Sequence, residues 1–366
     1  MRHLAPALVA GLLAASSALA QPAPVLRSDL AVSVKSTAPG MAGAQSRLYV
    51  RQVKLAQAPA RSRGVVLFVH GAGTPAEVAF DTTHGDFSWM AYLARAGFDV
   101  YSMDMTGYGR SARPPPMENP CTLPSALQAP FVPAACPPAW TGPITTMASD
   151  WNDIDAVVDH LRAKTGVKQV ALVGWSQGGP RTGGYAAAHP DKVSRLVVLA
   201  PAYTRDGPTV APPAAPGAPV LTTQSQAEFV ENWRRQAPCA GQFSPETATH
   251  VWSELQESDP VGAKWGPGVR RAPAVATAGF NRSVVAKLTV PYLMVAGLTD
   301  GQVNPVQVRE LYEDLGSRDK VLVELACSSH NAMWESHRLL LFKASLDWLT
   351  EGKVQGLSRG VVKLGE

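Results

Sequence analysis

Gly174-Trp175-Ser176-Gln177-Gly178 stands between a short apolar run, residues 170–173, and a stretch whose pattern predicts a helix to about residue 188. A buried strand that turns sharply into a helix lifts the central side chain above the edge of a sheet. The flanking glycines leave room for the strained backbone of such a turn. Pro180 falls in the first helical turn, where a missing backbone N–H costs little. The stretch therefore predicts an exposed, nucleophilic hydroxyl at Ser176.

Strand-like and helix-like patterns alternate on both sides of this stretch. We expect strands at residues 48–55, 65–69, 98–103, 195–199, 292–296 and 321–325, and helices at 88–96, from Ser149-Asp150 through 161, at 305–315 and at 333–349. This alternation predicts an α/β fold with a mainly parallel central sheet and helices on both faces. Ligands of such sheets bind at the carboxyl ends of the strands. The tail, residues 352–366, has no clear pattern.

Two segments interrupt the alternation. Residues 112–143 hold ten of the 31 prolines, and proline removes a backbone donor and fixes φ, so this stretch is predicted to be a long external loop. Residues 202–283 carry Pro-rich turns around two expected helices, near 224–235 and after Ser244-Pro245-Glu246. We interpret them as a cap insertion over the sheet, within one domain that covers residues 21–366.

The first twenty residues predict a secretory signal. Arg2 and His3 precede an apolar run at residues 4–14, and Ala18-Leu19-Ala20 supplies small residues at the cleavage site. The run is shorter than the ~20 residues of a spanning helix. We expect cleavage after about Ala20, no stable membrane anchor, and a secreted or periplasmic protein. The formal net charge of +4 without a dense basic run predicts no nucleic-acid binding.

All four cysteines lie after the predicted cleavage site, and an oxidising compartment favours their pairing. Three connectivities are possible. Cys121 and Cys136 flank the Pro-rich stretch, so we pair them, and Cys239 then pairs with Cys327 by elimination. Unpaired buried thiols are the alternative. No CxxC or CxxH spacing is present, so no metal site is predicted.

From about residue 48 to 349 the chain resembles the α/β-hydrolase superfamily, and in particular its exported bacterial esterases and lipases. His70-Gly71-Ala72-Gly73 looks like the family's oxyanion loop, and residues 104–111, DMTGYGRS, are similar to its D-x-x-G-x-G-x-S turn. The turn at Ser176 follows, then an acid and then a histidine, which is the order that this fold uses. Trp175 departs from the histidine that many members have before the nucleophile.

The resemblance implies a catalytic triad of Ser176, His330 and Asp300. Asp300 follows the strand expected at 292–296, and His330 follows the last expected strand. The aspartate would fix the tautomer of the histidine, which would take the serine proton and return it to the leaving group. Asp104 and Asp206 are the rival acids, Asp104 being assigned to a structural turn in the family.

The resemblance also implies an oxyanion hole made by the backbone N–H groups of Gln177 and Ala72, with Gly73 as neighbour and possible substitute. Trp175 and Tyr203 are candidates to line the substrate site beside Gly73. Trp233, Trp252 and Trp265 either line an apolar site or form the core of the cap.

We expect a serine hydrolase that cleaves small-molecule or lipid-like carboxylic esters and needs neither metal nor cofactor, because serine, imidazole and backbone amides suffice for acyl transfer. Within the fold, thioesterase, lactonase, aminopeptidase, carbon–carbon bond hydrolase and perhydrolase or acyltransferase activities stay open. A non-catalytic binding protein is a further alternative, against which the complete triad argues.

Overall fold

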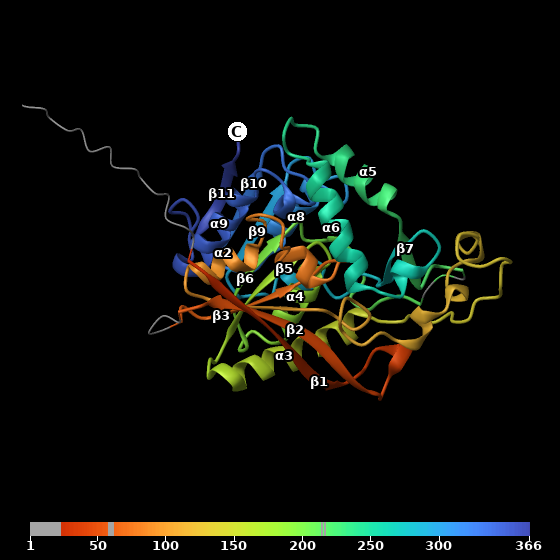
Figure 1. The fold of residues 1–366 in the computed structure, drawn as a ribbon. Coiled ribbons are helices and arrows are strands. Elements are labelled where there is room, and N and C mark those ends of the chain that lie inside the picture. Colours follow the sequence, from red (N-terminus) through yellow and green to blue (C-terminus); the bar gives the residue numbers. More distant parts are fainter. Residues whose placement is uncertain (1–22, 58–61, 214, 216) are drawn as a thin grey trace, which may run out of the picture.

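The computed structural model describes residues 23–57, 62–213, 215 and 217–366 (Figure 1). The predicted signal peptide, residues 1–20, lies outside this range. Within the described residues, nine strands form a central sheet in the order β1-β2-β4-β3-β5-β6-β9-β10-β11. β1 and β4 each run antiparallel to β2, and the other neighbouring pairs are parallel.

The strands of this sheet are β1 (Val25–Lys35), β2 (Gln45–Leu55), β3 (Val65–Val69), β4 (Asp99–Met103), β5 (Val170–Trp175), β6 (Val193–Leu199), β9 (Tyr292–Gly297), β10 (Lys320–Leu325) and β11 (Arg359–Leu364). Every residue of β3, β5, β9 and β10 is buried, which explains their nearly unbroken apolar sequences. A strand has such an apolar sequence when both faces of its sheet are covered.

Helices cover the sheet: α1 (Ala76–Phe80), α2 (Trp89–Arg95), α3 (Met147–Thr165), α4 (Gly178–Ala188), α7 (Arg282–Val285), α8 (Pro305–Asp314) and α9 (Arg338–Glu351). α2 packs against α9, and α3 packs against α4 (Figure 1). The short helix α7 contacts both α4 and α8. The predicted fold class, a mostly parallel sheet flanked by helices, is confirmed.

The chain between β6 and α7 forms α5 (Gln226–Gln236), α6 (Pro245–Ser258) and a separate antiparallel pair, β7 (Leu221–Gln224) with β8 (Arg270–Pro273). The two strands were not expected from the sequence. Trp233 and Trp252 belong to the main apolar core, and Trp265 packs in a second apolar cluster with Met117, Leu123, Ile144 and Val269. These tryptophans are therefore core residues.

Some boundaries differ from expectation. The edge strands β1 and β11 were not predicted. Only Val32 and Val34 of β1 and Val362 of β11 are buried, so neither strand has a strong apolar pattern. The long helix α3 begins at Met147 rather than at Ser149-Asp150. Thr146 is its N-cap, and Ser149 completes a capping box three residues later.

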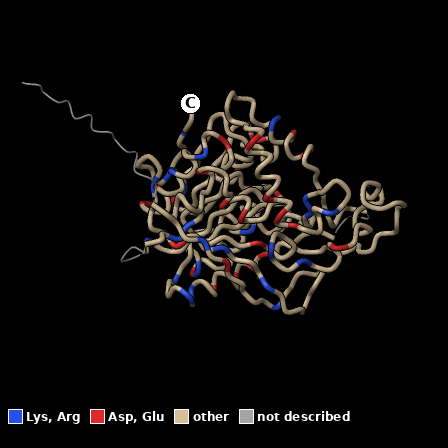
Figure 2. The backbone as a smooth tube through the Cα atoms, viewed as in Figure 1, with Lys and Arg blue, Asp and Glu red and all other residues tan. Residues whose placement is uncertain are grey.

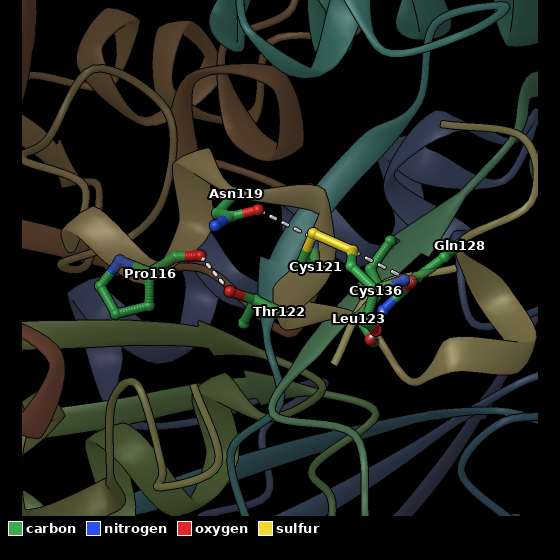
Figure 3. The surroundings of a disulfide bond; sticks show 7 residues. All are labelled: Pro116, Asn119, Cys121, Thr122, Leu123, Gln128 and Cys136. Atoms are coloured by element: carbon green, nitrogen blue, oxygen red, sulfur yellow. Dashed lines mark hydrogen bonds between the residues drawn. A yellow bond between two sulfur atoms is a disulfide. The ribbon is translucent and has the colours of Figure 1, made fainter. Parts of the chain in front are cut away.

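Residues 112–143 contain short 3₁₀ turns but no longer element, and project from the body of the molecule (Figure 1). Cys121 is disulfide-bonded to Cys136 within this loop. Gln128 lies beside the bond, accepting from the Cys136 N–H at 2.8 Å and donating to the Leu123 carbonyl at 2.9 Å (Figure 3). The disulfide bond and these hydrogen bonds therefore connect distant residues within the loop. Lys and Arg are interspersed with Asp and Glu along the backbone trace (Figure 2).

Candidate active site

Ser176 lies at the sharp turn between β5 and α4 and is the only non-glycine residue there with a left-handed backbone, at φ +57°. The turn is packed against neighbouring backbone. A Cβ atom added at Gly178 would come within 2.5 Å of the Val69 carbonyl oxygen, and one at Gly174 within 2.6 Å of the Gly178 oxygen. Only glycine fits at either position, so the two glycines let this turn form and leave Ser176 partly exposed at the sheet edge.

His330 and Asp300 meet at the same edge of the sheet. They follow β10 and β9, and His330 Nδ1 lies 2.8 Å from Asp300 Oδ2, with both side chains almost fully buried. The other carboxylate oxygen, Asp300 Oδ1, accepts the N–H groups of Gln302 and Val303 at 2.7 and 2.8 Å. Asp300 is therefore fixed in place and orients the imidazole with Nδ1 as the donor.

The histidine loop is held directly against the turn that carries Ser176. Trp175, the preceding residue, donates its indole N–H to the His330 carbonyl oxygen at 2.8 Å, and the two rings lie 5.4 Å apart. The tryptophan that replaces the family's frequent histidine thus joins two of the predicted site segments.

Two backbone N–H groups beside Ser176 are free to receive an anion. In the described part of the chain, neither Ala72 nor Gln177 donates its backbone N–H to a protein acceptor. Both residues line one hollow of about 880 Å³, which we call the apolar hollow. Its wall is mostly alanine, proline and valine from the β7–β8 pair and the segments on either side of it, joined by Pro143, the last residue of the Pro-rich loop, and Met147, the first residue of α3.

The loop that carries Ala72 is fixed by two groups. Arg181, fully buried in α4, donates Nη1 to the carbonyl oxygens of His70 and Gly71, both at 2.9 Å, and pairs through Nε with Asp150 at 2.7 Å. His70 donates Nδ1–H to the Gly71 oxygen at 2.7 Å and accepts the Met105 N–H at 3.1 Å. Burial and the nearby guanidinium hold the pKa of His70 well below its usual value, so the ring is neutral.

Arg181 was not predicted from the sequence, although an arginine in the first turn of an otherwise apolar, glycine-rich helix was a usable signal.

Glu335 is a second supporting residue that was not predicted. Its buried carboxylate accepts the Ser329 N–H at 2.9 Å and the Trp233 indole N–H at 3.0 Å. Burial raises the pKa of Glu335. It therefore links α5 to the loop that carries His330.

A disulfide bond makes the same link covalent. Cys239, just beyond α5, is bonded to Cys327, three residues before His330. The structure thus contains the two pairings expected from the sequence, and the described residues include no free cysteine.

The other candidates lie elsewhere. Asp104 accepts the backbone N–H groups of Ala76 and Arg110 at 2.8 and 2.9 Å, and burial raises its pKa to about 6. Asp206 is exposed. Tyr203 is buried and donates its hydroxyl to Asp314 at 2.7 Å, so its polar end is turned toward α8.

Gly73 and Trp175 line two further hollows. The polar hollow, about 580 Å³, includes Gly73, Gln224, Asn232 and Arg270. The histidine hollow, about 30 Å³, includes Trp175, His330 and again Gln224, Asn232 and Arg270. The two hollows share these last three residues and are therefore neighbours. Within the described ranges, no group of histidine, cysteine and acidic side chains could hold a metal ion.

A family model described as serine aminopeptidase, S33, matches residues 60–337. The chain belongs to this family. Membership of the S33 family places the chain in the α/β-hydrolase superfamily, as the sequence motifs predicted, and makes it a hydrolase of that fold.

Solved structures agree on the fold. A monoacylglycerol lipase from Paleococcus ferrophilus is 19% identical, with a TM-score of 0.53 over 84% of this chain and 99% of its own. A thermophilic esterase from Thermogutta terrifontis is 15% identical, with a TM-score of 0.53 over 87% and 98%. The 2-hydroxy-6-oxo-6-phenylhexa-2,4-dienoate hydrolase from a Rhodococcus species is 16% identical, with a TM-score of 0.54 over 88% and 99%. The S33 chain shares the fold of these three hydrolases.

The sequence matches none of the curated proteins with which it was compared. In the part of the chain that the structure describes, no helix has both the length and the apolar character needed to cross a membrane.

Proposed function

We propose that the protein is a serine hydrolase that cleaves carboxylic esters through Ser176, His330 and Asp300. The observation that carries the proposal is the 2.8 Å contact between His330 Nδ1 and Asp300 Oδ2, made on a loop that Trp175 joins to the Ser176 turn. With the proton on Nδ1, the lone pair of the neutral imidazole is on Nε2, the atom that acts as a base.

In the proposed reaction, His330 takes the proton of the Ser176 hydroxyl as Oγ attacks the carbonyl carbon. The N–H groups of Ala72 and Gln177 stabilise the resulting oxyanion, and one such donor is typically worth about 10²–10³ in rate. The imidazolium then protonates the departing alcohol, and a water molecule activated by His330 releases the acid from the acyl-enzyme. Among the described residues Ser176 Oγ makes no hydrogen bond, and the only side-chain hydrogen bond of His330 is the one to Asp300. The proposed mechanism therefore requires Ser176 and His330 to come into contact when substrate binds.

The family's name raises one competing activity, that of an aminopeptidase. An aminopeptidase must bind a substrate ammonium close to the scissile bond, where a carboxylate would serve. The hollow beside His330 instead contains the cationic Arg270. In the adjoining polar hollow, Glu231 is paired with Arg234, and Glu228 accepts the backbone N–H and the hydroxyl of Ser225. This charge arrangement favours an ester over a peptide N-terminus.

The substrate test compares p-nitrophenyl esters of graded acyl length with the matching anilides and thioesters. Ser176→Ala should abolish ester hydrolysis and leave the far-ultraviolet spectrum and the unfolding midpoint unchanged. The matched control is Ser253→Ala, an exposed serine on α6, which should keep full activity. Ester hydrolysis retained by Ser176→Ala would refute the nucleophile, and faster cleavage of anilides than of esters would favour the peptidase.

We also propose that the protein is exported and that residues 202–283 act as a cap over the site. Two disulfide bonds support an oxidising destination. N-terminal sequencing of protein recovered outside the cytoplasm should begin at Gln21. A full-length chain that stays in the cytoplasm with free thiols would contradict the export proposal.

A further inference from the structure

Arg270 is a partly buried cation without an acidic partner. At the start of β8, it donates Nη1 to Thr74 Oγ1 at 2.8 Å and Nη2 to the side-chain oxygen of Gln224. Both acceptors are neutral. In the described part of the chain, no carboxylate forms an ion pair with it. Its remaining N–H groups are available to a ligand.

The other buried arginines of the site region are paired. Arg181 is bound by Asp150 at 2.7 Å, and Arg271, the next residue on β8, is bound by both oxygens of Asp259 at 2.9 and 2.8 Å. Burial lowers the pKa of Arg270 to about 10, which still leaves it charged at neutral pH. Removing a cation from water without a counter-charge is unfavourable, and such groups concentrate at functional sites.

The guanidinium lies against the predicted oxyanion loop. A Cβ atom at Gly73 would come within 2.8 Å of Arg270 Cζ, so the absence of a side chain at position 73 leaves room for the guanidinium. Arg270 lines both the polar hollow and the histidine hollow, which His330 and Trp175 also line. Glu228 and Glu231, the acids of the polar hollow, are bonded to Ser225 and Arg234 instead.

We propose that Arg270 binds an anionic group, a carboxylate above all, on the leaving-group half of the substrate. This inference rests on the proposed ester hydrolysis. In that reaction the departing oxygen faces His330 because it receives the proton of the imidazolium. Arg270 shares the histidine hollow with that imidazole, so it is on the leaving-group side. The apolar hollow, beside the N–H groups of Ala72 and Gln177, accommodates the acyl chain. The substrate class is an apolar acyl ester of an alcohol or phenol that carries an acid group.

The test uses two esters with the same acyl chain, 4-(hexanoyloxy)benzoate and its methyl ester, which differ in the charge of the leaving group. The kcat/KM of each is divided by its rate of alkaline hydrolysis, so that intrinsic reactivity cancels. The wild-type protein should prefer the anionic ester. Arg270→Gln should lower this preference about 10- to 100-fold, which is the scale of a charge-assisted hydrogen bond, mainly through KM. Hydrolysis of the methyl ester measures any effect of the substitution on the loop that Arg270 contacts, and the ratio of the two rates removes that effect from the comparison.

Two further variants separate recognition from folding. Arg270→Lys keeps the charge but loses the planar fork, and should retain part of the preference. Lys264→Gln removes an equal charge from an exposed position in the same segment, and should keep the wild-type preference. Equal normalised rates for the two esters in the wild-type protein, or an unchanged preference in Arg270→Gln, would overturn the proposal.

Binding to Ser176→Ala protein distinguishes this proposal from the proposed function. If neither ester is hydrolysed by the wild-type chain, ester hydrolysis fails. Calorimetry on Ser176→Ala protein then tests whether Arg270 binds the anionic group, independently of catalysis. Tighter binding of the anionic ester, lost in Ser176→Ala/Arg270→Gln, supports anion recognition, and equal or absent binding of the two esters refutes it.

Discussion

The disulfide bond between Cys239 and Cys327 should affect both stability and catalysis, which sets it apart from the other disulfide. It closes a loop of 88 residues, against 15 for Cys121–Cys136. In the chain-entropy model, cross-linking these spans removes about 4.6 and about 3 kcal/mol, respectively, of unfolded-state freedom at 25 °C. The double variant Cys239→Ser/Cys327→Ser should therefore lose up to roughly 4–5 kcal/mol of unfolding free energy.

The two disulfide bonds should differ more in their effect on catalysis than in their effect on stability. Cys327 is three residues before His330, and a misplacement of about 1 Å in a catalytic group can cost on the order of 10²-fold in rate. We expect kcat on a p-nitrophenyl ester to fall about 10- to 100-fold in Cys239→Ser/Cys327→Ser. The matched control, Cys121→Ser/Cys136→Ser, leaves the histidine loop untouched and should change kcat by less than about threefold.

The assay combines urea unfolding followed by tryptophan fluorescence with ester kinetics on the same preparations. If Cys239→Ser/Cys327→Ser keeps the wild-type kcat while its unfolding midpoint drops, the bond stabilises the fold without positioning His330. If the two double variants lose kcat equally, the reasoning from the position of Cys327 is refuted.

Two more changes test the site and its surroundings. Asp300→Asn should lower kcat about 10⁴-fold with little change in KM, because the histidine then takes the wrong tautomer; a loss below about tenfold, measured with p-nitrophenyl esters, would remove Asp300 from the triad. Asp153, a buried residue of α3, accepts the Thr106 N–H at 3.0 Å, and burial raises its pKa to about 7 from an ordinary 3.8. Between about pH 4 and 7 the folded protein therefore holds a proton that the unfolded chain has lost, and the stability that this proton contributes disappears as pH rises through that range. Asp153→Asn should flatten the decline of unfolding free energy over that range in urea titrations, and an unchanged slope would contradict the shift.

The centre of the fold was predictable because its signals are local. Ser176 is flanked by glycines that the turn needs, and the strand before it is apolar throughout. Asp300 and His330 could be placed because each follows a buried strand, and parallel strands bring such positions to one edge of the sheet. The missed strands β1 and β11 lie at the edges, where partial burial leaves only a weak apolar pattern.

The site's supporting residues were harder to predict because their partners are distant in sequence. Arg181 acts on the carbonyl oxygens of residues more than a hundred positions away, and Glu335 meets the indole of Trp233 across a similar gap. Nothing next to Arg270 in the chain distinguishes it from Arg271, yet one is paired with Asp259 and the other has no acidic partner. Tertiary contacts, not local pattern, decide which arginine is available to a ligand.

The Pro-rich loop has its own disulfide bond and shares an apolar cluster, separate from the core of the sheet, with the β7–β8 segment, and its last residue, Pro143, forms part of the wall of the apolar hollow. Mutations in this region would alter the wall of the apolar hollow, whereas the sheet and the loops that carry Ser176, Asp300 and His330 would keep their own contacts. Substitutions in this region, natural or engineered, can therefore change the range of substrates with little effect on the stability of the fold.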